Sequence, residues 1–426
     1  MTEVSAIVIG AGIIGTACAL QLARAGVRVR LIDPEEPGSA CSSGNAGSIS
    51  EESIVPMALP GMLAKVPGWL MDPEAPLHVR WRYVPRAAPW LLRWIVASSE
   101  SNAAASAAAL RPFLSGAVDA YADLLGAGSF DALVRRRGQL IVWESTAPSR
   151  SERAAHALRE RHGVAMRWLG PAEIAEIEPN LAGHFARGLL LERHGQVVDP
   201  KRVVSALARD FIAVGGAVVR ARVARLVPTG AGGRVILDDG SELGADRIVV
   251  SAGAWSRELA RQAGVDVPLE TERGYHAMID GAAAICSRPV MHGDLSFIAT
   301  PMADGLRIAG TVEIAGLSAP PDYRRAQVLL AQARRMFRGL DTQQASYWMG
   351  LRPSVPDSVP VIGEAPSAGG ILFAFGHGHL GMTGAPATAR IIRDLALDRK
   401  PNIDLAPFRP DRFRGIFGHG RRAGQA

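Results

Sequence analysis

The sequence predicts an α/β protein of two domains, one built on a parallel sheet and the other on a mostly antiparallel sheet. Residues 6–33 have the pattern of a strand, a glycine-rich turn, a helix and a second strand. Helix and strand alternate again at 200–259 and at 371–397. Between these segments, strands expected at 273–279, 296–300 and 306–313 follow one another without a helix. Alternation is typical of a parallel sheet, and consecutive strands are typical of an antiparallel one.

The expected domain boundaries follow from this arrangement. We expect residues 1–90, 195–270 and 345–426 to form a discontinuous nucleotide-binding domain. Residues 91–194 and 271–344 would then form a substrate-binding domain. A chain of 426 residues, 48% of them hydrophobic and 21% charged, has the length and composition of a globular protein with two or three domains.

Charge and cysteine content argue against several classes of site and partner. The net charge of +6 is spread over the chain, and the basic run at 135–137 is too short to predict nucleic-acid binding. The three cysteines lack CxxC spacing, so we expect free thiols in the reducing cytoplasm and no metal. The uncharged stretch 4–23 is long enough to span a bilayer, but glycines interrupt it and no basic segment precedes it. We expect a buried strand and helix there.

The first turn carries a dinucleotide-binding pattern. Gly10, Gly12 and Gly15 lie between the β-branched run 6–9 and the helix expected at 13–25. Gly10 permits a tight turn, Gly12 lets a pyrophosphate approach the backbone, and Gly15 lets the helix pack closely on the strand. The alternative is a glycine-tolerant turn without a ligand.

Two further features of this segment favour the ligand. The N–H groups of the helix N-terminus, at Ile13 and Ile14, have no partner within the helix and attract phosphate oxygens. Asp33 ends the second strand, where a carboxylate accepts hydrogen bonds from ribose hydroxyls.

The loop after Asp33 is rich in small and hydroxylated residues, "PGSACSSGNAGSIS". Ser42 and Ser43 are placed to bond a pyrophosphate. The backbone at Ala46, Gly47 and Ser48 would let a flat ring pass close by. A solvent-exposed loop is the alternative for this stretch.

The segment 60–112 differs in composition from its surroundings. It holds Trp69, Trp81, Trp90 and Trp94, several prolines and an alanine-rich helix. We expect these tryptophans to pack under a lid, with a membrane-contact surface as the alternative.

Arg352 stands in an otherwise apolar stretch, "YWMGLRPSVPDSVPVIG", and the chain that follows it offers no acidic residue until Asp357. A guanidinium is always charged, and burying it alone costs several kcal/mol. We therefore predict that Arg352 binds an anionic ligand.

Two other side chains are candidates for the same site. Tyr275 lies in an expected strand and would project its hydroxyl into a cavity, or else pack in the core. His377 and His379 lie in a glycine loop whose spacing is poor for a metal, so a histidine bonded to backbone is the first expectation. A substrate-side role for His379 is the alternative.

The order of the motifs "SSGNAGSIS", "ERGYHAMI", "GTVEIAG", "GLRPSVPDSVPVIG" and "GHGHLGMT" after the N-terminal unit resembles one family. This family is the FAD-dependent amino-acid oxidoreductases of the D-amino-acid oxidase and glycine oxidase superfamily. The likeness is greatest to the bacterial D-amino-acid dehydrogenases of the small-subunit type and the related cis-4-hydroxy-D-proline dehydrogenases. It implies FAD and a glutathione-reductase-like Rossmann domain with a second, mostly antiparallel, domain.

The resemblance also implies roles for individual residues. Gly10, Gly12 and Gly15 would form the pyrophosphate turn, Asp33 would bind ribose, and Arg352 would pair with the substrate α-carboxylate. Further positions would line the cofactor: Ile13, Ile14, Ser42, Ser43, Ala46, Gly47, Ser48, Val223 beside adenine, Gly253, Gly378, Leu380, Gly381, Met382 and Thr383.

The implied reaction is oxidative deamination of a D-amino acid to a 2-oxo acid, with electrons passed to a quinone or another respiratory acceptor. A cyclic imino acid substrate and a glycine- or sarcosine-type oxidase are alternatives within the family; a nicotinamide-only dehydrogenase and a non-catalytic flavoprotein lie outside it. Peripheral contact with the inner face of the cell membrane stays open. His379, Glu51 and Glu52 depart from the family pattern where specificity is set. No side chain presents itself as a general base, which suits an amine that binds in its neutral form.

Overall fold

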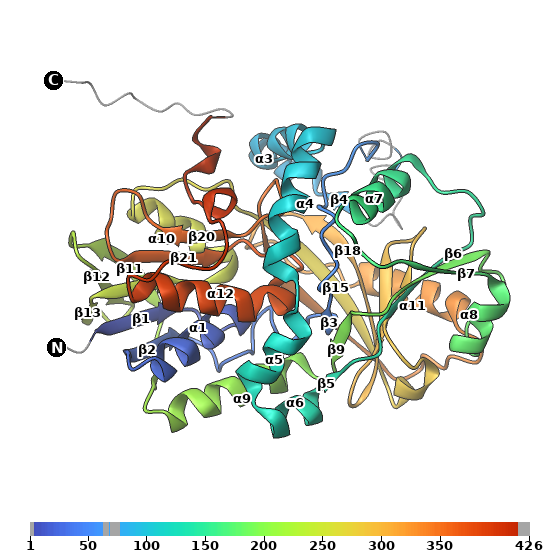
Figure 1. The fold of residues 1–426 in the computed structure, drawn as a ribbon, viewed down its shortest axis with the longest axis horizontal. Coiled ribbons are helices and arrows are strands. Elements are labelled where there is room, and N and C mark those ends of the chain that lie inside the picture. Colours follow the sequence, from blue (N-terminus) through green and yellow to red (C-terminus); the bar gives the residue numbers. More distant parts are fainter. Residues whose placement is uncertain (1–3, 63–67, 69–76, 416–426) are drawn as a thin grey trace.

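The computed structural model describes residues 4–62, 68 and 77–415, and Trp69 lies outside these ranges. The protein has two main sheets that lie toward opposite ends of the molecule (Figure 1). Within the described ranges no helix is both long and apolar enough to cross a membrane.

The first sheet has six strands, and its order places the N-terminal strand near the centre. Five strands are parallel, and the edge strand β20 is antiparallel to its neighbour. The short β-branched strands are buried on both faces, as a parallel sheet covered by helices requires. The order is β10 (Ala217–Arg220), β2 (Arg28–Asp33), β1 (Ser5–Ile9), β14 (Arg247–Val250), β21 (Ile371–Phe375) and β20 (Val361–Glu364).

Helices cover both faces of this sheet. One face packs on α1 (Ile13–Arg24), α9 (Pro200–Ala213) and α12 (Gly381–Ala396). The other packs on α10 (Ser256–Gln262) and a small sheet of β11 (Val223–Pro228), β12 (Gly233–Leu237) and β13 (Glu242–Ala245).

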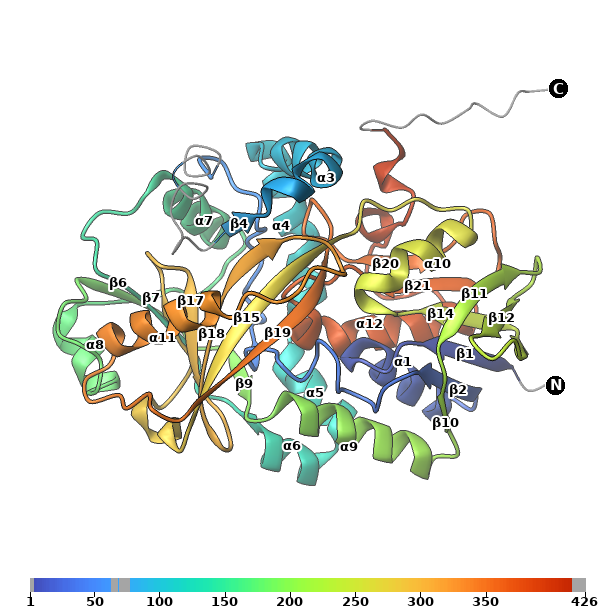
Figure 2. The same cartoon turned by 180° about the vertical axis from the view of Figure 1, so that it is seen from behind.

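The second sheet is mostly antiparallel, and β15 and β19 are its long strands on the side of the first domain (Figure 2). Helices α11 (Arg324–Met336) and α8 (Pro171–Ile177) cover one of its faces. Its order is β19 (Ala345–Ser354), β15 (Glu270–Asp280), β18 (Gly305–Ile314), β17 (Phe297–Pro301), β16 (Val290–His292), β6 (Gln139–Trp143), β8 (Arg187–Leu191) and β7 (Arg167–Leu169), with β4 (Leu77–Val79) beside β18.

Most of the remaining helices lie along the junction of the two sheets (Figure 1). Helices α4 (Glu100–Leu114) and α5 (Ala117–Leu125) pack on α12, and α6 (Ala127–Leu133) follows them. Helix α3 (Val84–Ala97) lies beside β4, and α7 (Arg150–Arg161) follows β6. A small sheet of β3 (Ser48–Ile49), β9 (Gly195–Val197) and β5 (Val134–Arg135) lies nearby.

The predicted fold class is confirmed, because one parallel and one mostly antiparallel sheet are present. The expected domain boundaries differ from the sheets in two places. Strands β4 and β19, assigned to the first domain, pair in the second sheet. Helices α4 and α5, assigned to the second domain, share a core with α1 and α12. Strand pairing and helix packing between distant segments leave no local trace in the sequence.

Candidate active site

The packing of the first turn requires two of its three glycines. Gly10 has φ of +101°, and a Cβ there would lie 2.5 Å from the Ser251 carbonyl oxygen. A Cβ on Gly15 would overlap the Gly10 carbonyl oxygen. These two glycines are therefore needed by the fold itself, with or without a ligand.

Gly12 is different, because a Cβ there would meet only the Ser42 hydroxyl, at 3.2 Å. The N-cap residue Gly12 offers no side chain to cap α1, and the first turn of the helix holds no acidic residue. Ser42 Oγ accepts a hydrogen bond from the Ile13 N–H at 3.0 Å. Asp33, at the end of β2, accepts from the Ala11 N–H at 2.7 Å. The open surface over Gly12 and the positive end of the helix suit an anionic group.

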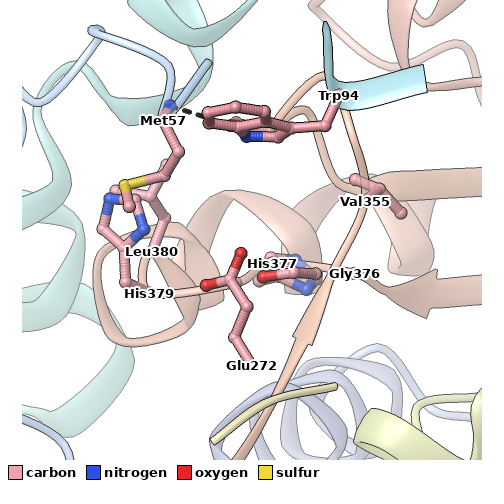
Figure 3. Close-up of a pocket in the computed structure, with 11 residues that line it drawn as sticks. Met57, Trp94, Glu272, Val355, Gly376, His377, His379 and Leu380 are labelled. Carbon is pink, nitrogen blue, oxygen red and sulfur yellow. Dashed lines mark hydrogen bonds between the residues drawn. The ribbon is translucent and has the colours of Figure 1, made fainter. Parts of the chain in front are cut away.

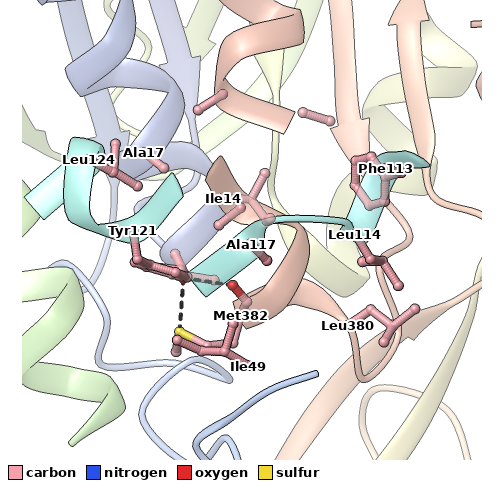
Figure 4. Close-up of a cluster of buried hydrophobic side chains, with 14 of the residues drawn as sticks. Ile14, Ala17, Ile49, Phe113, Leu114, Ala117, Tyr121, Leu124, Leu380 and Met382 are labelled. Carbon is pink, nitrogen blue, oxygen red and sulfur yellow. Dashed lines mark hydrogen bonds between the residues drawn. The ribbon is translucent and has the colours of Figure 1, made fainter. Parts of the chain in front are cut away.

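The N-terminus of α12 adjoins that of α1. Ile13 Cγ2 lies 4.0 Å from the position of a Cβ on Gly381. The α12 N-terminus also lacks a side-chain cap and an acidic residue. Tyr121, fully buried on α5, donates to the Met382 carbonyl oxygen at 2.6 Å (Figure 4). Two positive helix ends thus point at one region.

The loop 42–48 is held between the two sheets, so the solvent-loop alternative is wrong. Arg307 on β18 donates to the Ser43 carbonyl oxygen at 3.0 Å. The Val197 N–H donates to the Gly47 carbonyl oxygen at 2.7 Å, and Ser48 Oγ donates to Gln139 Oε1 at 2.9 Å. The Ser43 hydroxyl donates instead to the Ala40 carbonyl oxygen, at 2.9 Å. The backbone of this loop is fixed, and Ala46 lies within it.

Arg352 lies on the face of the second sheet that meets this loop. In the β15–β19 ladder it is paired with Glu272, and Gly274 is the next residue on the same face. The guanidinium covers Gly274, where a Cβ would lie 2.7 Å from Arg352 Nε. It donates to the Thr311 carbonyl oxygen at 3.3 Å. Thr311 has φ of +59°, an uncommon conformation for a β-branched residue that is often found at functional sites.

The anion that Arg352 needs is not supplied by the described part of the chain. Among residues 4–62 and 77–415, no carboxylate forms an ion pair with its guanidinium. Asp357, the acidic residue nearest in sequence, pairs with Arg412 at 2.9 Å. Arg352 therefore keeps donors for a ligand, and a carboxylate matches its fork geometry.

A small pocket is lined by Glu272 and His379 (Figure 3), and the charge of Arg352 acts on both side chains. The labelled side chains of Glu272, His379, Met57 and Trp94 surround it. Burial, together with the charge of Arg352, lowers the pKa of His379 to about 4. His379 is thus neutral at pH 7 and offers one donor and one acceptor.

His377 plays a different part from His379. Its Nε2 atom lies 2.9 Å from Thr388 Oγ1, and the residue is buried. The sequence predicted a hydrogen bond between this histidine and the backbone, but its partner is the Thr388 side chain on α12. No group of three or more histidines, cysteines or carboxylates that could hold a metal occurs within the described ranges.

The structure does not bring Tyr275 to the pocket. Along β15 its side chain alternates with Gly274 and lies on the opposite face of the sheet from Arg352. The hydroxyl donates to Glu313 Oε2 at 2.6 Å and accepts from the Asp322 N–H at 3.0 Å. The expectation that this hydroxyl projects into the substrate cavity is wrong, because the odd-numbered residues of β15 face α11.

Comparison with known proteins identifies the family. The family model of FAD-dependent oxidoreductases (DAO) matches residues 5–395. This chain belongs to that family. It is 39% identical over 413 residues to a D-amino-acid oxidase of Bradyrhizobium diazoefficiens, covering 95% of this chain and 98% of the relative. It is 30% identical over 420 residues to a D-amino acid dehydrogenase of the same organism, covering 97% and 99%.

Solved structures share the fold of this FAD-dependent oxidoreductase. L-proline dehydrogenase from P. horikoshii has a TM-score of 0.73 at 18% identity, covering 97% of this chain and 98% of the other. Glycine oxidase from Geobacillus kaustophilus has a TM-score of 0.71 at 21% identity, covering 97% and 99%.

The residues present fit FAD. The open surface at Gly12 and the two helix N-termini, which have no acidic residue in their first turns, suit a pyrophosphate and the electron-rich end of a flavin. Asp33 stands where a ribose would be bound. Val223 begins β11, and Gly253 lies in the turn before α10; both are on the carboxyl-end side of the parallel sheet, and their contacts with FAD remain predictions.

Sequence reasoning missed three residues of this site. Glu272 was missed because a carboxylate in "TERGYH" is typical of a surface residue, whereas the structure buries it on the face of β15 that also carries Gly274. Thr311 and Arg307 come from β18, far from Arg352 in sequence. The acids Glu51 and Glu52, expected near the substrate, are buried elsewhere: Glu51 pairs with Arg193 at 2.8 Å.

Proposed function

We propose that this FAD-dependent oxidoreductase oxidises D-amino acids to 2-oxo acids and passes the electrons to an acceptor other than oxygen. The observation that carries the proposal is the Arg352 guanidinium, which lacks a carboxylate partner among the described residues and lies on the face that meets the loop 42–48. The names of the relatives at 39% and 30% identity support a D-amino acid as substrate.

The side chains of the pocket act by positioning. Arg352 would hold the α-carboxylate through two charge-assisted hydrogen bonds, which fixes the direction of the Cα–H bond. Neutral His379 adds no charge to compete with the guanidinium. FAD, when bound, supplies the hydride acceptor. Trp94 and Met57 cover the pocket and would keep water from it.

The test of this proposal is replacement of Arg352. Losing a bidentate pair should cost about 2–5 kcal/mol, so Arg352→Met should lower kcat/KM for D-amino acids about 30- to 5000-fold with FAD still bound. Arg352→Lys keeps the charge but loses the fork, so it should mainly raise KM. Near-normal kcat/KM in a flavin-loaded Arg352→Met variant would contradict the proposal.

The substrate itself should be sought with an anaerobic screen that follows flavin bleaching. D-amino acids, cis-4-hydroxy-D-proline, glycine and sarcosine should be offered side by side, with L-amino acids as controls. If only glycine or sarcosine bleaches the flavin, the protein is a glycine- or sarcosine-type oxidase and the proposal for D-amino acids is wrong.

The position of helix α3 favours a lipophilic molecule as the electron acceptor. Its inward residues Trp90 and Trp94 reach the active site: the Trp90 indole donates to the Ser354 carbonyl oxygen at 3.3 Å, and Trp94 lines the pocket. Dye or quinone should therefore be reduced faster than oxygen. Equal rates of peroxide formation and dye reduction would favour the oxidase alternative.

The outward face of α3 and the turn before it is apolar with a basic edge. Trp81 is 75% exposed, Leu92 53% and Ile95 42%, and Arg82 and Arg86 are exposed beside them. Apolar side chains with flanking cations match an anionic lipid surface. We therefore propose that the protein contacts the inner face of the cell membrane through α3.

Vesicle co-sedimentation tests this contact. The double variant Leu92→Asp/Ile95→Asp should lose about tenfold or more in binding to phosphatidylglycerol vesicles. Ile212→Asp, at an equally exposed site on α9, is the matched control. Equal binding by the double variant and the control would exclude α3 as the membrane contact.

A further inference from the structure

Glu272 is a buried carboxylate that the reaction described above does not use. It is 6% exposed, and its side chain points into the pocket between His379 and His377 (Figure 3). Three elements contribute to its surroundings: the 376–380 loop, α3 through Trp94, and the 354–358 turn. Burying a charged carboxylate in this way lowers the stability of the folded protein unless a cation binds to it.

Arg352 is not that cation in this structure. The two residues are paired across β15 and β19, yet no ion pair joins them. The guanidinium lies over Gly274, while the Glu272 carboxylate is directed toward His379 and Met57. The Glu272 carboxylate in the pocket and the Arg352 guanidinium on the neighbouring strand are therefore close enough to interact, but no ion pair joins them.

A zwitterionic amino acid has the complementary pair of charges on neighbouring atoms. We propose that Glu272 receives the substrate amino group and accepts one of its protons, while Arg352 holds the carboxylate. This rests on the proposed function of the same site. One N–H bond breaks and its electron pair stays on nitrogen, while an O–H bond forms on Glu272. The neutral amine can then release hydride from Cα, and the carboxyl proton later returns to solvent.

The electrostatics around Glu272 are consistent with a proton acceptor. Burial raises its pKa, and the charge of Arg352 and a hydrogen bond from Ser354 oppose that rise. His377 and His379 face it from the loop, and burial lowers their pKa values to about 3 and about 4, so both are neutral. Glu270, two positions earlier on β15, adds a like charge. A carboxylate whose pKa is raised by burial is a better proton acceptor than an exposed one.

Two probes separate the amino group from the carboxylate. 2-Aminoisobutyrate carries both groups but has no Cα–H bond, so it binds without being oxidised. 2-Methylpropanoate lacks the amine. Binding of each is measured from the visible spectrum of the bound flavin. Glu272→Gln should weaken 2-aminoisobutyrate about tenfold or more and leave 2-methylpropanoate within about threefold.

The matched control is Glu178→Gln. Glu178 is also buried, but it accepts hydrogen bonds from the Ser287 N–H and hydroxyl and does not line the pocket, so this variant should leave both affinities unchanged. Arg352→Met should weaken both probes. If Arg352→Met binds 2-methylpropanoate as well as wild type does, the carboxylate site and with it the proposed function fail. If Arg352→Met weakens both probes but Glu272→Gln does not discriminate between them, only the Glu272 assignment fails.

Kinetics give a second readout that a purely structural role would not move. Glu272→Gln should lower kcat/KM for a D-amino acid about 10²-fold at pH 7. The loss should shrink as pH rises toward the pKa of the substrate ammonium, because solution then supplies the neutral amine. Glu272→Asp should keep part of the activity. A pH-independent loss, or equal weakening of both probes by Glu272→Gln, would overturn the proposal.

Discussion

Gly274 offers a direct test of where the Arg352 guanidinium lies. Gly274 is not among the glycines with positive φ, so alanine can adopt its backbone conformation. The added Cβ would lie 2.7 Å from Arg352 Nε, and Cζ and Nη2 are closer still. Ordinary contact begins at 3.4 Å, so the whole guanidinium must withdraw. A shift of about 1 Å at a positioning group can cost about 10²-fold in rate.

We expect Gly274→Ala to raise KM for D-amino acids and lower kcat/KM about 10²-fold, with FAD content unchanged. The free energy of unfolding should change by about 1 kcal/mol or less, because the flexible side chain moves and alanine restricts the unfolded chain. Steady-state dye reduction, the flavin spectrum and urea unfolding measure the three quantities.

Gly128→Ala on α6 is the control, since a Cβ there meets nothing within 4 Å. It should leave kcat/KM unchanged. If Gly274→Ala with bound FAD keeps kcat/KM within about threefold of wild type, the guanidinium does not hold the carboxylate from this position, and the reasoning fails.

Three further outcomes are expected. Gly12→Val should purify folded but without flavin absorbance, because the branched side chain fills the phosphate surface, while a Cβ at this position meets only the Ser42 hydroxyl in the protein; full flavin content would contradict this. Tyr121→Phe leaves the buried Met382 carbonyl without this hydrogen bond and should lower the free energy of unfolding in urea by about 1–3 kcal/mol. An unchanged midpoint of the urea transition would show that the bond contributes nothing to stability. Burial lowers the pKa of His194 to about 3, so only the unfolded chain takes up this proton below about pH 6.5, and stability should fall by up to about 1.4 kcal/mol per pH unit. His194→Gln should flatten the fall in melting temperature between about pH 6.5 and 4.5, and a slope equal to wild type would refute the assignment.

The sequence by itself determined the features that depend on neighbours in the chain. The turn at Gly10, Gly12 and Gly15 is local, because steric freedom and helix geometry fix it within a few residues. The fold class followed from the alternation of elements, which is also a local pattern. Arg352 could be singled out because a lone charge in an apolar stretch needs a partner wherever the stretch lies.

Only the tertiary structure decided which face of each strand meets the ligand. Tyr275 and Glu272 lie on one strand, and the sequence singled out only the tyrosine as a candidate, with packing in the core as its alternative. Alternation puts them on opposite faces, but it does not say which face α11 covers. That choice depends on contacts between β15 and segments far away in the chain. The same reason explains the tryptophans: Trp90 and Trp94 pack inward and Trp81 outward, because α3 has one face on the protein and one in solvent.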